Sequence, residues 1–88
     1  MSYKVEYLPD VVKTLKKMDN FTKRMIIDWI EKHLVNCEDP RLYGKPVSAN
    51  RVDQRRYRIG DCRIISKTED YKLVILVIAI GHRSDIYK

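Results

Sequence analysis

The fold of this 88-residue chain is decided by residues 55–80, RRYRIGDCRIISKTEDYKLVILVIAI. Side chains of residues 55–59 alternate between two faces, as in a half-buried strand, and those of residues 62–67 do the same. Gly60 and Asp61, which lie between these two runs, are typical turn residues. The spacing therefore predicts a β-hairpin, whose two strands must be antiparallel.

A third strand is predicted directly after this hairpin. Residues 68–71 form a polar turn, and residues 73–80 (LVILVIAI) are apolar at every position. A continuous apolar run of this length is typical of a strand that is covered on both faces. We therefore expect residues 73–80 to be the central strand of the sheet, with Gly81 at its end.

The N-terminal part of the chain predicts one strand and one helix. Residues 3–8 (YKVEYL) alternate with period two, which indicates a strand. Pro9 is well placed to open a helix, and Asp10 adds an acid to its first turn. Apolar residues then recur at helical spacing until Asp19 and Asn20 break the helix. Asn20 is expected to be the N-cap of the next helix.

The strongest periodic signal in the chain is an apolar stripe that predicts a second helix, ending near Val35. Because only a short turn separates it from the first helix, we expect an antiparallel helix pair. The stripe is predicted to be core and consists of Phe21, Met25, Ile26, Trp29, Ile30 and Leu34. Residues 38–52 contain two prolines, one glycine and no periodicity, so they are expected to be mostly loop.

Together these elements predict an α+β fold with a single domain, residues 1–88. A chain of this length supports one domain and no more. The expected order is an N-terminal strand, an antiparallel helix hairpin, and a three-stranded antiparallel run that completes one sheet. The helix pair must cover one face of that sheet, which leaves the other face for a partner or a substrate.

The charge of the chain is strongly asymmetric. The net charge is +6, and the whole excess lies in residues 41–88, where arginines outnumber lysines. The planar fork of arginine suits bidentate recognition of phosphate. This half of the chain is compatible with a merely solvated basic face, and it also favours nucleic acid or an acidic protein as the partner.

Several other classes of protein find little support in the sequence. The longest apolar run has eight residues, far fewer than the roughly 20 that span a membrane. No signal-peptide stretch is present, so we expect a cytoplasmic protein with no membrane partner. Cys37 and Cys62 are too few for a metal site or a disulfide framework and are expected to be free, structural thiols. His33 is expected to be a packing or surface residue.

Basic side chains of the predicted hairpin share one face. Arg56 and Arg58 are two residues apart, and hairpin pairing can bring Arg63 beside them. We expect these three arginines to form a cationic groove on the face that the helices leave open. After the third strand, His82 has an ordinary pKa near 6.5, which suits proton transfer at neutral pH. Tyr87 can act as a base only if nearby cations stabilise its phenolate.

The same segments resemble a known family. RRYRIGDCRII (55–65), followed by LVILVIAIGHRSDIY (73–87), resembles the RelE branch of the RelE/ParE toxin superfamily, and the opening YKVEYLPDVVKTLKKMD (3–19) agrees with it. The resemblance implies a toxin of a type II toxin–antitoxin system, an endoribonuclease that cuts mRNA in the ribosomal A site without a metal ion or other cofactor. The implied reaction is attack of a ribose 2′-OH on the adjacent phosphate.

The resemblance also implies roles for individual residues. Arg63 matches the arginine that stabilises the phosphate, Arg83 matches the arginine after the central strand, and Tyr87 matches the C-terminal tyrosine, a candidate base. Arg56 lies where the family often has a lysine, and His82 lies where some members have one. The acid and the base are left open among the three residues of the C-terminal segment. Four residues are expected to bind substrate, namely Arg55, Arg58, Lys67 and Arg51.

The chain departs from the family pattern at Gln54, where some members have a second catalytic lysine. The implied partners are a cognate RelB-like antitoxin, expected to cover the basic half, and the ribosome with its mRNA. The toxin is expected to be a monomer within the toxin–antitoxin complex. Two alternatives stay open, a ParE-like toxin that inhibits DNA gyrase without cutting nucleic acid, and a basic binding module without activity.

Overall fold

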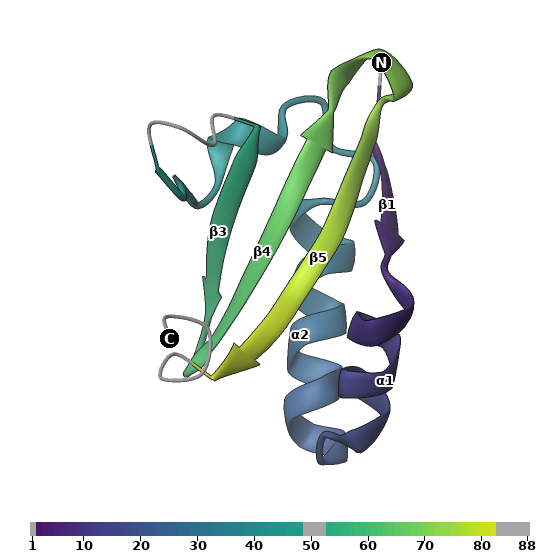
Figure 1. Ribbon diagram of the computed structural model, residues 1–88, viewed down its shortest axis with the longest axis vertical. Helices are drawn as coiled ribbons and strands as arrows, with labels where there is room; N and C mark the ends of the chain where they lie inside the picture. Colours follow the sequence, from purple (N-terminus) through teal and green to yellow (C-terminus); the bar gives the residue numbers. More distant parts are fainter. Residues whose placement is uncertain (1, 49–52, 83–88) are drawn as a thin grey trace.

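The computed structural model describes residues 2–48 and 53–82, with His82 described by its backbone alone. One five-stranded sheet carries two helices on one face, and Figure 1 shows both helices behind the sheet. No helix in the described part of the chain is long and apolar enough to cross a membrane. In chain order the elements are β1 (Lys4–Tyr7), α1 (Pro9–Lys17), α2 (Asn20–His33), the 3-10 turn η1 (Pro40–Leu42), β2 (Lys45–Pro46), β3 (Gln54–Ile59), β4 (Cys62–Glu69), the 3-10 turn η2 (Asp70–Lys72) and β5 (Val74–His82).

The sheet has the strand order β1-β5-β4-β3-β2. Strands β3, β4 and β5 pair antiparallel in succession, as the hairpin pattern predicted, whereas β1 pairs parallel with β5. The predicted α+β fold, with a helix pair on one face of one sheet, is confirmed. The prediction that residues 73–80 form the central strand is wrong: β5 is interior, but β4 is the middle strand, because the short β2 adds to the outer edge of β3.

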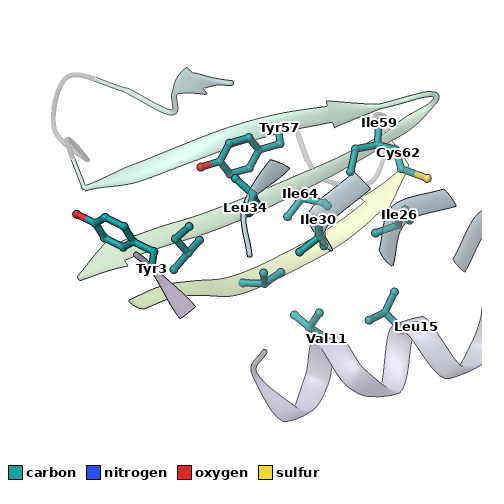
Figure 2. Packing of buried hydrophobic residues seen from close by; sticks show 12 residues of the cluster. Tyr3, Val11, Leu15, Ile26, Ile30, Leu34, Tyr57, Ile59, Cys62 and Ile64 are labelled. Atoms are coloured by element: carbon teal, nitrogen blue, oxygen red, sulfur yellow. The ribbon is translucent and has the colours of Figure 1, made fainter. Parts of the chain in front are cut away.

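The core lies between the two helices and one face of the sheet. Figure 2 shows Val11 and Leu15 of α1, and Ile26 and Ile30 of α2, packed toward the strands. The strands contribute Tyr57, Ile59, Cys62, Ile64, Ile75 and Val77, and Tyr3 joins them directly before β1. Burying apolar side chains of this size contributes about 1.5–3 kcal/mol each. Of the stripe that was predicted to be core, Ile26, Ile30 and Leu34 are fully buried, whereas Phe21, in the first turn of α2, is 79% exposed, so its assignment to the core is wrong.

Only one face of β5 is covered by helices. Ile75 and Val77 are fully buried, whereas Leu76 and Ile78 keep part of their surface exposed. The prediction that both faces of this strand are covered is therefore not met among the described residues. The apolar run was ambiguous because it is equally compatible with a strand that presents a half-buried apolar face on its second side.

The pairing of β5 with β4 contains a β-bulge. The register shifts by one residue at Ile78, which has no partner on β4. Without this shift Ile80 would lie opposite Arg63, whereas in the structure Gly81 does. A bulge re-aims every residue beyond it. The residue of β5 that pairs with Arg63 is therefore a glycine, which has no side chain.

The helix boundaries differ slightly from the predicted ones. Asp19, not Asn20, is the N-cap of α2, because Asp19 is the last extended residue and its carboxylate accepts a hydrogen bond from the Thr22 backbone N–H at 2.9 Å. This bond holds the pKa of the Asp19 carboxyl below its usual range. The helix ends at His33 rather than near Val35. The chain then turns at Asn36 (φ +63°) and bonds back to the start of the first strand.

The segment between α2 and β3 is held in place by several polar contacts. The Tyr57 hydroxyl donates to the Pro40 carbonyl (3.2 Å), and the Arg41 guanidinium pairs with Asp70 (2.7 Å). The Asp70 carboxylate also accepts a hydrogen bond from the Tyr3 hydroxyl (2.7 Å). This segment was predicted to be mostly loop, and the structure adds η1 and β2 to it. It leads directly into the candidate site.

The contact between Asp70 and its two partners predicts a pH dependence of stability. The Arg41 guanidinium, and after it the Tyr3 hydroxyl, holds the pKa of the Asp70 carboxyl below its usual range. A carboxyl with a depressed folded pKa stabilises the fold above its unfolded pKa of about 3.9, and this contribution is lost as the pH falls through the folded value. At pH 6 we expect the unaltered protein to have a slightly higher urea midpoint than Asp70→Asn. This difference should begin to decrease near pH 4 and be lost as the pH falls further, through the folded pKa of Asp70.

The matched control for this measurement is Asp28→Asn. Asp28 is an exposed carboxylate on α2 that takes part in no ion pair among the described residues. Its substitution should leave the difference in urea midpoint independent of pH. A pH-independent difference for Asp70→Asn as well would show that the Arg41–Asp70 pair adds nothing to stability.

Candidate functional site

The hairpin of β3 and β4 brings the predicted arginines together. Arg58 lies directly opposite Arg63 in the register, and Arg56 is on the same face two residues earlier. The alternate residue, Tyr57, is buried against the helices. Like charges directly opposite each other on a sheet are destabilising. The hairpin therefore holds an unfavourable arrangement of cations that an anion would relieve.

These arginines line one pocket, with a volume of about 330 Å³. The pocket lies beside the pairing of β3 with β2, and the paired residues Arg56 and Lys45 both line it. Four cations line it and, among the described residues, no carboxylate does. The lining consists of Trp29, Tyr43, Gly44, Lys45, Arg56, Arg58 and Arg63. A concave lining whose charged side chains, among the described residues, are all cations suits a phosphate group.

Arg63 is the most unusual member of this cluster. Only 6% of its surface is exposed, and no ion pair of the described residues involves it. Its guanidinium Nη1 donates one long hydrogen bond, 3.3 Å, to the Cys62 carbonyl. Burying a charge without an opposite charge is costly. A buried arginine with most of its donors available is therefore a strong candidate for binding an anion.

Arg55 has a different position from its neighbours. Its Nε donates to the Tyr43 carbonyl (3.0 Å) and its Nη2 donates to the Gly44 carbonyl (2.9 Å). Arg55 does not line the pocket. It therefore acts on the pocket by positioning the loop that forms one wall, and we keep substrate binding by Arg55 only as a prediction.

Lys67 lies at the far end of β4 from the pocket. It is four residues from Arg63, which is about 13 Å along a strand, and its Nζ is 3.9 Å from a carboxylate oxygen of Asp53. Its cross-strand partner is Gln54, the residue that departs from the family pattern. Neither side chain lines the pocket. Gln54 is nevertheless on the same face of β3 as Arg56, two residues away.

The C-terminal candidates are only partly covered by the structure. His82 pairs with Cys62 at the end of β5, one residue beyond the Gly81–Arg63 pair. The end of β5 therefore lies next to Arg63. Arg51, Arg83 and Tyr87, which the sequence nominated, lie outside the described residues.

Two aromatic residues of the site were missed by sequence reasoning. Trp29 was assigned to the core stripe of α2, and Tyr43 was treated as part of a loop. In the structure both line the pocket, and Tyr43 is 36% exposed. An aromatic residue on an apolar helix stripe gives no sequence signal that separates a core position from the rim of a pocket.

The other reactive side chains of the described chain do not form a second site. Cys37 and Cys62 are free thiols, as predicted, and desolvation by burial raises the pKa of both. Both thiols are thus held in their unreactive, protonated form at neutral pH. No group of three or more His, Cys, Asp or Glu side chains gathers into a metal-binding cluster within the described residues.

A family model matches most of the chain, and several solved structures share its fold. Residues 5–87 match the family model described as the ParE toxin of the type II toxin–antitoxin system, parDE. No curated protein sequence matches the chain. The fold is similar to the toxin–antitoxin complex RelBE2 from Mycobacterium tuberculosis, with 19% identity and a TM-score of 0.80 over 97% of this chain and 95% of that one.

Two further solved structures are similar. One is a mutant of the E. coli toxin RelE in the free state, with 21% identity and a TM-score of 0.78 over 99% of this chain and 92% of that one. The other is the archaeal RelE–RelB complex from Pyrococcus horikoshii OT3, with 23% identity and a TM-score of 0.69 over 94% of this chain and 97% of that one. At these identities the structural likeness establishes the fold.

Proposed function

Because this chain belongs to the RelE/ParE superfamily and is a toxin of a type II toxin–antitoxin system, we propose that it is an endoribonuclease that cuts mRNA in the ribosomal A site. The observation that carries this proposal is Arg63, which is buried with no carboxylate partner among the described residues, in a pocket that it shares with Arg56 and Arg58. A scissile phosphate supplies the negative charge that this pocket lacks.

The arginine cluster fits the charge that develops during RNA cleavage. The ribose 2′-oxygen forms a bond to phosphorus while the bond from phosphorus to the 5′-oxygen breaks. The products are a 2′,3′-cyclic phosphate and a free 5′-OH. Negative charge builds up on the non-bridging oxygens in between, and preorganised donors in a dry site stabilise it most effectively. Arg63 has this role in the proposal, with Arg56 and Arg58 binding the same phosphate.

Two protons must also move in this reaction. One leaves the attacking 2′-OH, and the other is added to the departing 5′-oxygen. In the proposal both transfers belong to the segment that starts at His82 and includes Arg83 and Tyr87. This assignment is supported by the position of His82 at the end of β5, one residue beyond the partner of Arg63. In the proposal the four cations of the pocket also favour the phenolate form of Tyr87.

The dimensions of the pocket support a dependence on the ribosome. A volume of about 330 Å³ is at the lower end of the range for ligand pockets, so the toxin by itself grips only a short part of a strand. Binding the mRNA on the ribosome would orient it for attack and supply the missing positional constraint. We accordingly expect little cleavage of free RNA.

The charge of the chain supports an antitoxin that covers the same site. We propose that an acidic segment of a RelB-like partner lies over the arginine cluster and competes with RNA, with one toxin monomer per site. The net charge of +6 lies entirely in the half of the chain that forms this pocket. Two of the similar structures described above are toxin–antitoxin complexes.

Inhibition of DNA gyrase is a second candidate function. It is favoured by the family model, which is named for the ParE toxin. This activity requires no phosphate pocket and leaves the buried Arg63 without a role. The pocket is the reason that we place the endoribonuclease first.

Primer extension on an mRNA in a purified translation system tests the proposed function. We expect cuts within codons that appear only when ribosomes are present, and 5′ fragments that end in a 2′,3′-cyclic phosphate. The matched reaction contains the same mRNA without ribosomes. Intact mRNA in both reactions with a folded protein would contradict the proposal, and loss of DNA supercoiling by gyrase in a parallel assay would then favour the second candidate.

A further inference from the structure

The pocket that holds the arginines also has an aromatic wall. Tyr43 and Trp29 line the same cavity as Arg56, Arg58 and Arg63. Phosphate stabilisation uses only the cations, so the two rings have no part in the reaction described above. Grooves that combine cations with exposed aromatic rings are typical of proteins that bind single-stranded nucleic acid, because the bases stack on the rings.

The aromatic wall is a packed unit. The Trp29 and His33 rings are stacked, with centroids 4.5 Å apart. Tyr43 lies edge-on to both of them, at interplanar angles of 77° to Trp29 and 75° to His33. Tyr43 is thus supported from behind by two rings, while more than a third of its surface stays exposed. A supported, exposed ring can accept a base at little cost in side-chain entropy.

The backbone that carries Tyr43 is equally constrained. The Arg55 guanidinium holds the carbonyls of Tyr43 and Gly44. Gly44 has φ +72°, and a Cβ at this position would overlap the carbonyl oxygen of Arg56. The loop therefore lies directly against β3. As a result, Tyr43 has a fixed position relative to the arginines of that strand.

We propose that this pocket binds one nucleotide, with its phosphate held by the arginines and its base stacked on Tyr43, which Trp29 supports. The inference rests on the proposed function, because it assumes that the phosphate belongs to RNA. A volume of about 330 Å³ suits a single nucleotide. Tyr43 is thus a binding residue, and stacking on its ring tolerates different bases.

The test compares two probes that carry the same number of phosphates. One is an RNA trinucleotide with 2′-O-methyl riboses, which lacks the attacking hydroxyl, and the other has the same backbone without the central base. Trp29 is the only tryptophan in the chain, so its fluorescence reports binding at the aromatic wall, and calorimetry gives an independent affinity. We expect the complete probe to bind about tenfold more tightly than the abasic one.

Variants identify the ring responsible for this ratio. Tyr43→Leu should reduce the ratio of the two affinities to about one, whereas Tyr43→Phe should keep it. Tyr71→Leu is the matched control, because Tyr71 is 84% exposed and lies on η2, outside the pocket. It should leave the ratio unchanged.

Two outcomes would overturn the inference. They are a ratio near one in the unaltered protein and an unchanged ratio in Tyr43→Leu. If the unchanged ratio came with an equal loss of affinity for both probes, Tyr43 would belong to the phosphate site or to the fold instead of lying under a base. Neither probe can be cleaved, so failure of the toxin to cut mRNA does not affect this ratio, and a ratio near one leaves the cleavage result standing.

Discussion

Replacing Arg63 by alanine is expected to reduce ribosome-dependent mRNA cleavage by about 100-fold to 1,000-fold, the usual effect of removing one preorganised donor to a transition-state oxygen. The loss should appear in the rate of cleavage at saturating ribosomes, because the interaction is strongest when charge has developed on the phosphate. Single-turnover primer extension measures this rate. Arg63→Lys keeps the charge but loses the planar fork, so we expect it to recover only part of the activity.

Arg24→Ala is the control for this substitution. Arg24 is an exposed arginine on α2 outside the arginine pocket, so its replacement changes the net charge equally. It should leave cleavage within about twofold of the unaltered protein, in line with the small effect expected of a distant surface change. Cleavage by Arg63→Ala at the same rate as by Arg24→Ala would remove the central assignment of the proposed site.

The stability of an Arg63 variant should change in the opposite direction from its activity. Arg63 is buried, and no carboxylate in the part of the chain that the structure describes pairs with it. Replacing a poorly compensated buried charge by an apolar side chain of similar volume is often stabilising. We expect Arg63→Met to unfold at a higher urea concentration than the unaltered protein while it loses cleavage. This pattern is the signature of a residue kept for function at a cost in stability.

Replacing Gly44 by alanine is expected to have the second-largest effect. The left-handed backbone at φ +72° costs a non-glycine residue about 1–2 kcal/mol. The added Cβ would also overlap the Arg56 carbonyl and come within 2.8 Å of the Tyr57 ring. Overpacking of this kind costs about another 1–3 kcal/mol. We therefore expect a loss of about 2–5 kcal/mol in the free energy of unfolding, measured by urea titration.

Gly60→Ala is the matched control for Gly44→Ala. Gly60 also has a left-handed backbone, φ +58°, but a Cβ there would meet only the flexible end of Met25, at 3.2 Å. It should lose only the backbone cost of about 1–2 kcal/mol. Equal losses in the two variants would show that the loop at Gly44 can move away from β3, and the rigid placement of Tyr43 would then be wrong.

Much of the fold was predictable from local pattern. The period of two in residues 55–59 and 62–67, with a glycine turn between them, predicted a hairpin, and its register brings Arg58 opposite Arg63. The second strand is longer than predicted, because Thr68 and Glu69 belong to β4 instead of the polar turn. The helical spacing of apolar residues in α2 likewise predicted a helix. The predicted start of α2 was wrong by one residue. Asp and Asn are both favourable N-cap residues, so only the backbone conformation shows that Asp19, and not Asn20, is the N-cap.

The position of β5 was harder to predict. An apolar run indicates burial but does not say which strand lies on either side. The parallel pairing with β1 joins residues about 70 positions apart, and no short-range pattern encodes such a contact. The bulge at Ile78 also has no recognisable pattern in the sequence, although it places Gly81 opposite Arg63.

The class of fold, the family and the hairpin that carries the arginine cluster could be inferred from the sequence, because these depend on periodicity and on a motif of adjacent residues. Three further facts are visible only in the folded chain: Arg63 is buried with no carboxylate partner among residues 2–48 and 53–82, Arg55 holds a loop, and Tyr43 and Trp29 line the arginine pocket. Each of these facts depends on contacts between a helix, a loop and two strands. Such contacts arise from the packing of the whole chain, since neither the charge nor the hydropathy of a residue specifies its distant neighbours.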